Sequence, residues 1–424
     1  MSRRRGEALP PGFGIIWASV AVDVVGFGIV LPILPIYAKR FHASSLQAAL
    51  LVTAFSGAAF VFSPLWGRLS DRIGRRPVIL VSLAGTAAGS LMTGLATGLP
   101  LLYAGRLVDG ASGASVAVAQ AAVADLADPS ERPRLFGLLG AAFGLGFVAG
   151  PAIGAMAALS GPRTPFFVAA ALAGVNTVIG LFRLPETMSS GPAGRPAGPA
   201  SSEARGPLTR AGRGEAPAPD SPAGLAPASA HSGSVLRRAD VWPLLLVAFT
   251  SMTAFSGFEA TFALFGQRHL GLTIGSAAAV FTAVGLVIVA VQGGVVHTVV
   301  LRFGEGATLA AGLGLDAAGL ALLAPARSWA LAAPALLLLT AGQGLVQTTM
   351  ASALSARAGP TSRGRVLGAQ QSASALARIA GPAIGGALLG VGGSSAAYWV
   401  GAALLGIALF VSFPAFRTVT KMQT

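Results

Sequence analysis

Long apolar runs separated by short polar segments dominate the sequence. Twelve of these runs hold roughly the 20 apolar residues that a helix needs to cross a lipid bilayer. They lie near residues 13–38, 47–67, 77–97, 100–122, 135–158, 164–184, 241–265, 272–300, 307–324, 329–354, 366–390 and 396–416. The pattern predicts an all-α polytopic membrane protein with twelve transmembrane helices, and an even number of spans places both termini on the same side.

A segment of different composition separates the first six runs from the last six. Residues 186–240 are rich in Pro, Gly, Ala and Ser, show no helical period and hold too few apolar residues to pack. We therefore expect an N-terminal six-helix bundle over residues 1–185, a disordered linker over 186–240 and a C-terminal six-helix bundle over 241–424.

The two bundles share a sequence pattern. Arg-Pro-Arg-Leu-Phe-Gly at 132–137, followed by Ala-Gly-Pro-Ala-Ile-Gly ending at Gly154, has a counterpart 231 residues later. There the chain reads Arg-Gly-Arg-Val-Leu-Gly from Arg363 and again Ala-Gly-Pro-Ala-Ile-Gly. A single offset aligns all of these positions, which predicts two equivalent six-helix repeats. In transporters built from such repeats the substrate site lies between them, near the middle of the membrane.

Composition and charge support the membrane assignment. The chain is 54% hydrophobic and only 10% charged, with a mean hydropathy of +0.72. Its net charge of +14 could suggest a nucleic-acid partner, but the placement of the basic residues argues against one. Of the 29 lysines and arginines, 22 fall in segments assigned to the inside, 5 outside and 2 within spans. This positive-inside pattern predicts cytoplasmic termini and a location in the inner or plasma membrane.

The most basic short segment is Gly67–Arg76, which reads Gly-Arg-Leu-Ser-Asp-Arg-Ile-Gly-Arg-Arg between two apolar runs. It predicts a tight hairpin on the cytoplasmic side, in which Gly67 and Gly74 permit a sharp turn and close helix approach. The segment resembles the G-x-L-x-D-R-x-G-R-R/K loop between the second and third helices of the major facilitator superfamily.

The resemblance implies that this segment is a gating loop formed by Gly67, Asp71, Arg72, Gly74, Arg75 and Arg76. Asp71 would pair with an arginine or a helix N-terminus in one access state, and Arg75 and Arg76 would help to hold it. The alternative is a charge cluster that only fixes the orientation of the chain in the membrane.

Ionisable residues inside predicted spans are costly and are therefore candidates for function. The predicted spans contain Asp23, Arg106, Asp109, Glu259, Asp316 and Arg378. A carboxyl group such as Asp23, in a cavity of low dielectric constant, can bind and release a proton as access alternates. It could instead be fixed permanently to a neighbouring helix.

The other intramembrane charges leave similar alternatives open. Arg106 resembles the arginine of the superfamily's R-x-x-x-G signature and could modulate a carboxyl group or bind an anionic group. It could also pair with Asp109, so that the two charges only neutralise each other. Glu259 and Asp316 could meet a cationic substrate, carry a proton or form interhelical hydrogen bonds, and Arg378 could counter one of these acids or reach for the membrane surface.

Two further sets of residues are candidates. The predicted helix over 135–158 carries Gly146, Gly150, Pro151 and Gly154. They resemble the proline–glycine motif of drug–proton antiporters, although small residues and a proline also serve as a packing face and a bend. Gln343 and Gln347, four residues apart, could line a polar cavity or tie helices together.

These motifs together resemble the tetracycline–proton antiporters within the drug–proton branch of the superfamily. One position departs from that group, which has an acid in the third helix where this chain has Gly89. Asp109 and Glu259 are charged groups that the resemblance does not account for. The resemblance implies proton-coupled efflux and leaves tetracycline itself open as a substrate.

We expect a monomeric exporter that exchanges a small amphipathic compound for protons and needs only the lipid bilayer, without a metal or a cofactor. An enzyme is not expected, because the chain lacks a zinc-binding His-Glu pattern, a phosphate-binding Gly-rich loop and any cysteine. The alternatives are an importer or facilitator of a small metabolite such as a sugar, amino acid or organic ion, and a receptor or scaffold without transport activity.

Overall fold

The computed structural model describes residues 9–113, 115–126, 131–187, 241–357, 363–391, 393 and 395–421. Every regular element within these ranges is a helix. In the first half of the chain the helices are α1 Phe13–Val30, α2 Leu34–Lys39, α3 Ser45–Ile73, α4 Arg75–Gly94, α5 Leu99–Ser112, α6 Ser115–Leu126, α7 Arg132–Ala158 and α8 Thr164–Arg183. In the second half they are α9 Trp242–His269, α10 Ile274–Ala290, the π-helix η1 Val291–Val295, α11 Val296–Leu323, α12 Trp329–Arg357, α13 Arg363–Val391 and α14 Ala396–Lys421.

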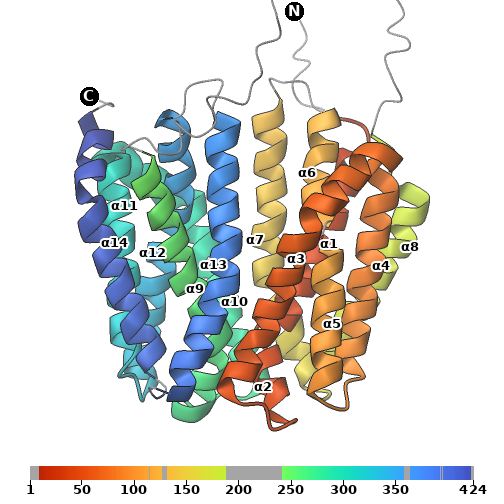
Figure 1. Cartoon of the computed structure of the whole chain (residues 1–424), viewed down its shortest axis with the longest axis horizontal. Coiled ribbons are helices and arrows are strands. Elements are labelled where there is room, and N and C mark those ends of the chain that lie inside the picture. Colours follow the sequence, from red (N-terminus) through yellow and green to blue (C-terminus); the bar gives the residue numbers. More distant parts are fainter. Residues whose placement is uncertain are drawn as a thin grey trace, which may run out of the picture.

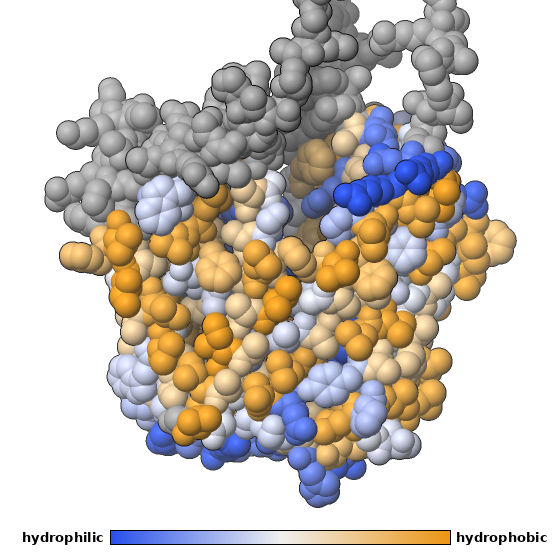
Figure 2. Space-filling view, in the orientation of Figure 1, coloured by the Kyte–Doolittle hydropathy of each residue, from blue (hydrophilic) through white to orange (hydrophobic). Residues whose placement is uncertain are grey.

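The long helices stand side by side in one bundle (Figure 1). We call the end near α2 the α2 end, and the opposite end, where α1 begins and α14 ends, the terminal end. On the face shown in Figure 2, orange apolar residues cover the middle of the described part of the molecule, and blue polar residues lie at both ends. Ten helical segments among the described residues are long and apolar enough to span a membrane. The protein is therefore a helical membrane protein, as the hydropathy pattern predicted.

Several predicted spans have different bounds in the structure. The run near 13–38 is two helices, because Pro32 and Pro35 interrupt it and α2 begins around the second proline. The run near 100–122 corresponds to α5 and α6, which together form one apolar segment, Leu99–Leu126, long enough to span a membrane. The runs near 272–300 and 307–324 are separated by a sharp break at Gly304, which has the non-helical angles φ +79° and ψ 163°.

Side-chain caps mark the start of α3 and of α10. α3 starts with a capping box, in which the Ser44 hydroxyl accepts from the Gln47 amide at 3.1 Å and the Gln47 side chain accepts from the Ser44 amide at 2.8 Å. Thr273 and Ser276 form the same arrangement at the start of α10. These caps satisfy amide groups that have no partner within the helix.

Each half of the chain packs mainly on itself. α1 packs on α7 and α8, and α4 packs on α5 and α8; in the second half α9 packs on α13 and α14, and α11 on α12 and α14. The two halves meet where α3 packs on α13 and α7 on α10. Leu264 and Ala278 of the second half belong to a buried cluster made otherwise of first-half residues, so the halves are joined by a hydrophobic core at the α2 end.

The sequence repeat is visible in the geometry. α7 and α13 begin 231 residues apart, at Arg132 and Arg363, and each contains a proline. Gly74 and Gly304 share an unusual backbone conformation, with φ +103° and ψ 159° at the first and φ +79° and ψ 163° at the second. The helices α7 and α13, and the backbone at Gly74 and Gly304, are therefore alike in local geometry. The predicted linker over 186–240 lies outside the described residues except for Glu186 and Thr187.

Candidate functional site

Asp23 forms the first part of a polar cluster inside the first half of the bundle. Its Oδ2 atom accepts a hydrogen bond from the Ser115 hydroxyl of α6 at 2.5 Å. The Ser115 amide in turn donates to the Ser82 hydroxyl of α4 at 2.8 Å. The other oxygen, Oδ1, is buried and has no hydrogen-bond partner among the described residues. One carboxyl oxygen of Asp23 is therefore hydrogen-bonded, and the other has no hydrogen-bond partner among the described residues.

Arg106 and Asp109 form a buried ion pair on α5. Arg106 Nη1 lies 3.0 Å from Asp109 Oδ2, and the two side chains are only 2% and 8% exposed. Thr93 accepts from Arg106 Nη2 at 3.2 Å, and Thr86 lies beside Asp109. The Arg106–Asp109 ion pair, one of the alternatives from the sequence, is therefore present. Asp109 also lies within electrostatic range of Asp23, so the pair and the single carboxyl group belong to one charge cluster.

Gly89 on α4 lies directly against Asp109. A Cβ atom added at Gly89 would come within 2.7 Å of the Asp109 Cβ and 2.8 Å of its amide nitrogen. The helices α4 and α5 could not approach this closely with a side chain at position 89. The tetracycline–proton antiporters that the sequence resembles have an acid at the position of Gly89. In this chain the carboxyl group beside that position is Asp109, on α5.

A second cluster lies in the other half of the chain, around Asp316 on α11. Asp316 is 1% exposed, and neither carboxyl oxygen has a hydrogen-bond partner within the described ranges. Ser251 of α9 lies beside it and donates to Gln343 Oε1 of α12 at 3.0 Å. Gln343 thus ties helices next to an acid, which is one of the two roles considered for it.

The remaining polar candidates, Gln347, Glu259 and Arg378, interact with other residues. Gln347 is exposed and accepts from Gln292, in the π-helix η1, at 3.1 Å. Glu259 on α9 and Arg378 on α13 are within electrostatic range of each other. The neighbouring Ile379 carbonyl accepts from the Thr53 hydroxyl of α3 at 3.3 Å, so this pair lies near a contact between the two halves.

The glycines of α7 form a packing face against α1. A Cβ at Gly150 would lie 2.7 Å from the Gly28 Cα, and a Cβ at Gly146 would lie 2.7 Å from the Val24 Cβ. Gly154 faces the Ile29 carbonyl in the same way. Close packing is therefore one role of this motif, whose Pro151 lies within α7.

The predicted gating loop is a one-residue turn. α3 continues to Ile73 and α4 begins at Arg75, so only Gly74 separates them. The expectation for Gly67 was wrong: it lies inside α3, and a Cβ there would meet nothing within 4 Å. Apolar content alone does not show that a helix continues past the membrane surface into polar residues.

Arg75 is the centre of this turn. Its guanidinium donates to Asp71 Oδ1 at 2.5 Å, to the Ser70 hydroxyl at 2.7 Å and to Asp125 Oδ2 of α6 at 3.0 Å. Asp71 therefore pairs with an arginine, one of the partners that the resemblance implied. Arg76 donates to the Leu181 carbonyl of α8 at 2.6 Å. Arg72 lies in the last turn of α3.

Glu186 closes the turn from the opposite side. Its carboxylate accepts from the amides of Arg75 at 2.9 Å and Arg76 at 3.2 Å. A negative side chain at a helix N-terminus satisfies free amides and is favoured by the helix dipole. A Cβ at Gly74 would collide with this carboxylate, so the glycine makes the cap possible.

Sequence reasoning missed several partners of the candidate residues. Ser115 and Glu186 are separated by 92 and 111 residues from Asp23 and Arg75, so no local pattern reveals these contacts. Glu305, immediately after the Gly304 break, is 5% exposed; it accepts from the Ser352 hydroxyl at one oxygen and has no partner for the other among the described residues. The sequence signal that could have identified Glu305 is its position directly after Gly304, the second copy of the glycine turn at Gly74.

Comparison with known proteins gives consistent matches along the chain. The family model of the Major Facilitator Superfamily matches residues 16–382. The chain is 32% identical over 413 residues to a class C tetracycline resistance protein of Escherichia coli, covering 95% of this chain and 96% of that protein.

Two solved structures resemble the whole fold. The human organic anion transporter MFSD10 (TETRAN) has a TM-score of 0.63 at 25% identity, covering 94% of this chain and 98% of its own. An inward-facing, occupied bacterial homologue of the human lysosomal transporter Spinster has a TM-score of 0.74 at 15% identity, covering 96% and 97%.

Proposed function

The chain belongs to the major facilitator superfamily, and from this premise we propose that it exports a small amphipathic compound in exchange for protons. Its family and its tetracycline resistance relative indicate a drug efflux transporter of the cell membrane, not an enzyme. Proton coupling, alternating access and a body of twelve spans in two six-helix repeats are the finer parts of the proposal.

The observation that carries proton coupling is the incomplete hydrogen bonding of two acids within predicted spans, Asp23 in the first half and Asp316 in the second. Among the described residues, Asp23 has no partner for one buried oxygen, and Asp316 has none for either. A charged carboxylate without partners is unfavourable in a water-poor interior, whereas a protonated one is tolerated. Such a group is suited to take up a proton when water reaches it from one side and to release it to the other.

The arrangement of charges in the first half suggests how protonation would be transmitted. Arg106 keeps its charge, because a guanidinium does not lose its proton in proteins. Asp109 is paired with this arginine and lies within electrostatic range of the Asp23 carboxyl group. A change of charge at Asp23 would therefore alter the balance of the Arg106–Asp109 pair and, through Thr86 and Thr93, the contact of α5 with α4.

Two moving bodies are supported by the packing. Each half packs mainly on itself, and the 231-residue repeat places α7 and α13 in equivalent roles. Contacts between the halves, such as Arg268 to the Ser45 hydroxyl at 3.0 Å, extend from the α2 end to the middle of the bundle. With the basic terminal end in the cytoplasm, this arrangement represents the inward-facing state.

The gating turn would break and re-form contacts during the same motion. In this state Asp71 is 62% exposed and bonded to Arg75 of its own hairpin. If the terminal end closed, the hairpin would approach the second half of the chain. Asp71 could then leave Arg75 and pair with a residue of the second half. The Glu186 cap ties the turn to the last helix of the first half, so these elements would move together.

A transport assay with and without a proton gradient tests the proposal. Cells expressing the chain should accumulate less of a fluorescent amphipathic drug than control cells, and an uncoupler should abolish the difference. One proton driven by about 100 mV supplies roughly 2.3 kcal/mol, enough for a gradient of about fiftyfold for an uncharged substrate. A facilitator of a small metabolite would instead equilibrate its substrate, and the uncoupler would leave that equilibrium unchanged.

A further inference from the structure

The α2 end of the bundle carries an unusual charge pattern. The segments that join helices there, at 31–44, 95–98, 159–163, 266–273, 324–328 and 392–395, contain five Lys or Arg residues and no Asp or Glu. The five are Lys39, Arg40, Arg163, Arg268 and Arg327. An end with only positive charges attracts anions and repels cations.

Two of these cations approach each other across the junction between the halves. Lys39 belongs to α2 of the first half and Arg268 to α9 of the second. Burial lowers the pKa of the Lys39 ammonium below its ordinary value, and the positive charge of Arg268 lowers it further. Closing the α2 end therefore brings like charges together, and the joining segments at this end contain no Asp or Glu to compensate them.

A cavity lies at the same junction. It has a volume of about 550 Å³ and is lined by both halves, including Ile36, Arg40, Leu159 and Pro162 of the first half and Gln267 and Ile274 of the second. We call it the seam pocket. A neighbouring hollow of about 460 Å³ shares Arg40 and Pro162 with it and adds Arg163. Volumes of this size accommodate a headgroup or a small organic anion.

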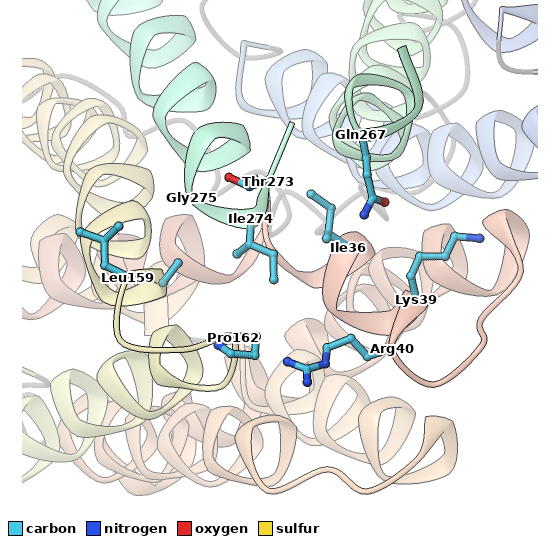
Figure 3. A pocket seen from close by; sticks show the side chains of 10 residues that line it. Ile36, Lys39, Arg40, Leu159, Pro162, Gln267, Thr273, Ile274 and Gly275 are labelled. Atoms are coloured by element: carbon cyan, nitrogen blue, oxygen red, sulfur yellow. The ribbon is translucent and has the colours of Figure 1, made fainter. Parts of the chain in front are cut away.

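Two polar side chains extend into the seam pocket from opposite halves. Figure 3 shows Arg40 reaching into it beside Pro162 and Gln267 extending toward Ile36, whereas the Lys39 ammonium points away. The Lys39 ammonium donates to the Ala43 carbonyl at 2.8 Å. The guanidinium fork of Arg40 and the amide of Gln267 together offer donors suited to a phosphate or carboxylate.

We propose that the seam pocket binds one anionic group, a phosphate or a carboxylate, through Arg40 and Gln267, and that the bound anion stabilises the conformation closed at the α2 end. The anion bridges the two halves and compensates the repulsion between their cations. The source is either the headgroup of an anionic lipid or a free anion. Binding itself does not depend on transport, whereas the effect on conformation rests on the alternating access proposed above.

Binding is tested on the purified full-length chain in detergent with three probes. These are dihexanoyl-phosphatidylglycerol, the zwitterionic dihexanoyl-phosphatidylcholine and inorganic phosphate, each titrated while tryptophan fluorescence and thermal stability are followed. Phosphatidylglycerol, inorganic phosphate or both should bind, and Arg40→Gln should weaken binding about tenfold. Gln267→Leu, which keeps every charge, should also weaken it. The matched control is Arg327→Gln, which removes one charge from the same end outside the pocket and should change nothing.

Each outcome decides the proposal. Binding of phosphatidylglycerol without binding of inorganic phosphate assigns the site to a lipid, and comparable binding of both assigns it to a free anion. Equal binding of phosphatidylcholine, no binding of any probe, or equal losses in Arg40→Gln and Arg327→Gln would overturn the proposal, because only diffuse surface charge would then be at work.

The conformational part uses spin labels, which the absence of native cysteine makes straightforward. Labels at Thr97→Cys and Ser328→Cys lie on exposed positions of the two halves at the α2 end. The anion that binds should increase the population with a short label distance, and Arg40→Gln should remove this response. An unchanged distance distribution at saturating anion would refute the stabilisation while leaving the binding result intact.

Discussion

The buried ion pair on α5 gives the most quantitative prediction. Arg106 and Asp109 are 2% and 8% exposed and 3.0 Å apart, Thr93 accepts a hydrogen bond from Arg106 Nη2, and Arg106 Nε has no partner among the described residues. Asp109→Ala leaves a guanidinium buried without its counter-charge, and arginine cannot escape by losing a proton. Removing one partner of such a pair costs about 3–5 kcal/mol of unfolding free energy.

The double variant Arg106→Leu/Asp109→Leu should behave differently. Replacing both charges by apolar groups removes the uncompensated charge, so its stability should lie near that of the wild type or above it. Transport, in contrast, should be lost in the single and the double variant alike, because both lack the charge cluster beside Asp23. This separation of stability from activity is what distinguishes a coupling role from a purely structural one.

The assay is equilibrium unfolding of purified protein in mixed micelles, followed by tryptophan fluorescence, with drug transport measured on the same preparations. Asp71→Ala is the matched control, because that carboxylate is also paired with an arginine but is 62% exposed, and its loss should cost about 1 kcal/mol or less. If Asp109→Ala destabilises no more than Asp71→Ala, the argument from burial is wrong. A double variant that still transports would remove the pair from the coupling mechanism.

Three further predictions concern close packing and the gating turn. Gly89→Asp should abolish expression of folded protein, because its Cβ would lie 2.7 Å from that of Asp109 and 2.8 Å from the Asp109 amide nitrogen and the Gly105 carbonyl oxygen; adding Asp109→Ser, which keeps the Cβ and the backbone, should not recover it, and the yield of monodisperse protein on size exclusion measures both. Glu186→Gln should lower stability by about 0.5–2 kcal/mol through the weakened cap of α4, measured by the same unfolding assay. Gly74→Ala should destabilise by at least about 1 kcal/mol, since its φ is +103° and the cap collides with a Cβ, while Gly67→Ala should be neutral or slightly stabilising. Equal effects of the two alanine variants would contradict this account of the turn.

The fold could be predicted from the sequence to the extent that hydropathy determines it. Bilayer-length apolar runs indicated the helices, whereas the two equivalent six-helix repeats suggested by the 231-residue offset stay a prediction. The bounds were less predictable, because polar residues continue α3 to Ile73 and a single glycine, Gly304, makes the break between the runs near 272–300 and 307–324. Local backbone conformation at glycine leaves no trace in hydropathy.

The site was predictable where its partners are close in sequence. Arg106 and Asp109 are three residues apart on one helix, and their pairing was among the alternatives. The Ser115 hydroxyl that anchors Asp23 and the Glu186 carboxylate that caps α4 come from distant helices, and serine and glutamate are too common to be singled out. Gly89 was noticed as a departure from a family pattern, but only the structure shows that it faces Asp109.

The central claim is that Asp23 exchanges protons during drug export. The most direct measurement is proton release from energised inside-out vesicles containing the transporter, followed with an internal pH dye while a panel of amphipathic compounds, including a tetracycline, is added. At least one compound should dissipate the gradient with the wild type and with Asp23→Glu, which keeps a titratable carboxyl group, but not with Asp23→Asn. If Asp23→Asn dissipates the gradient as fast as the wild type, or if no compound moves protons while a metabolite simply equilibrates, the proposed antiport is contradicted.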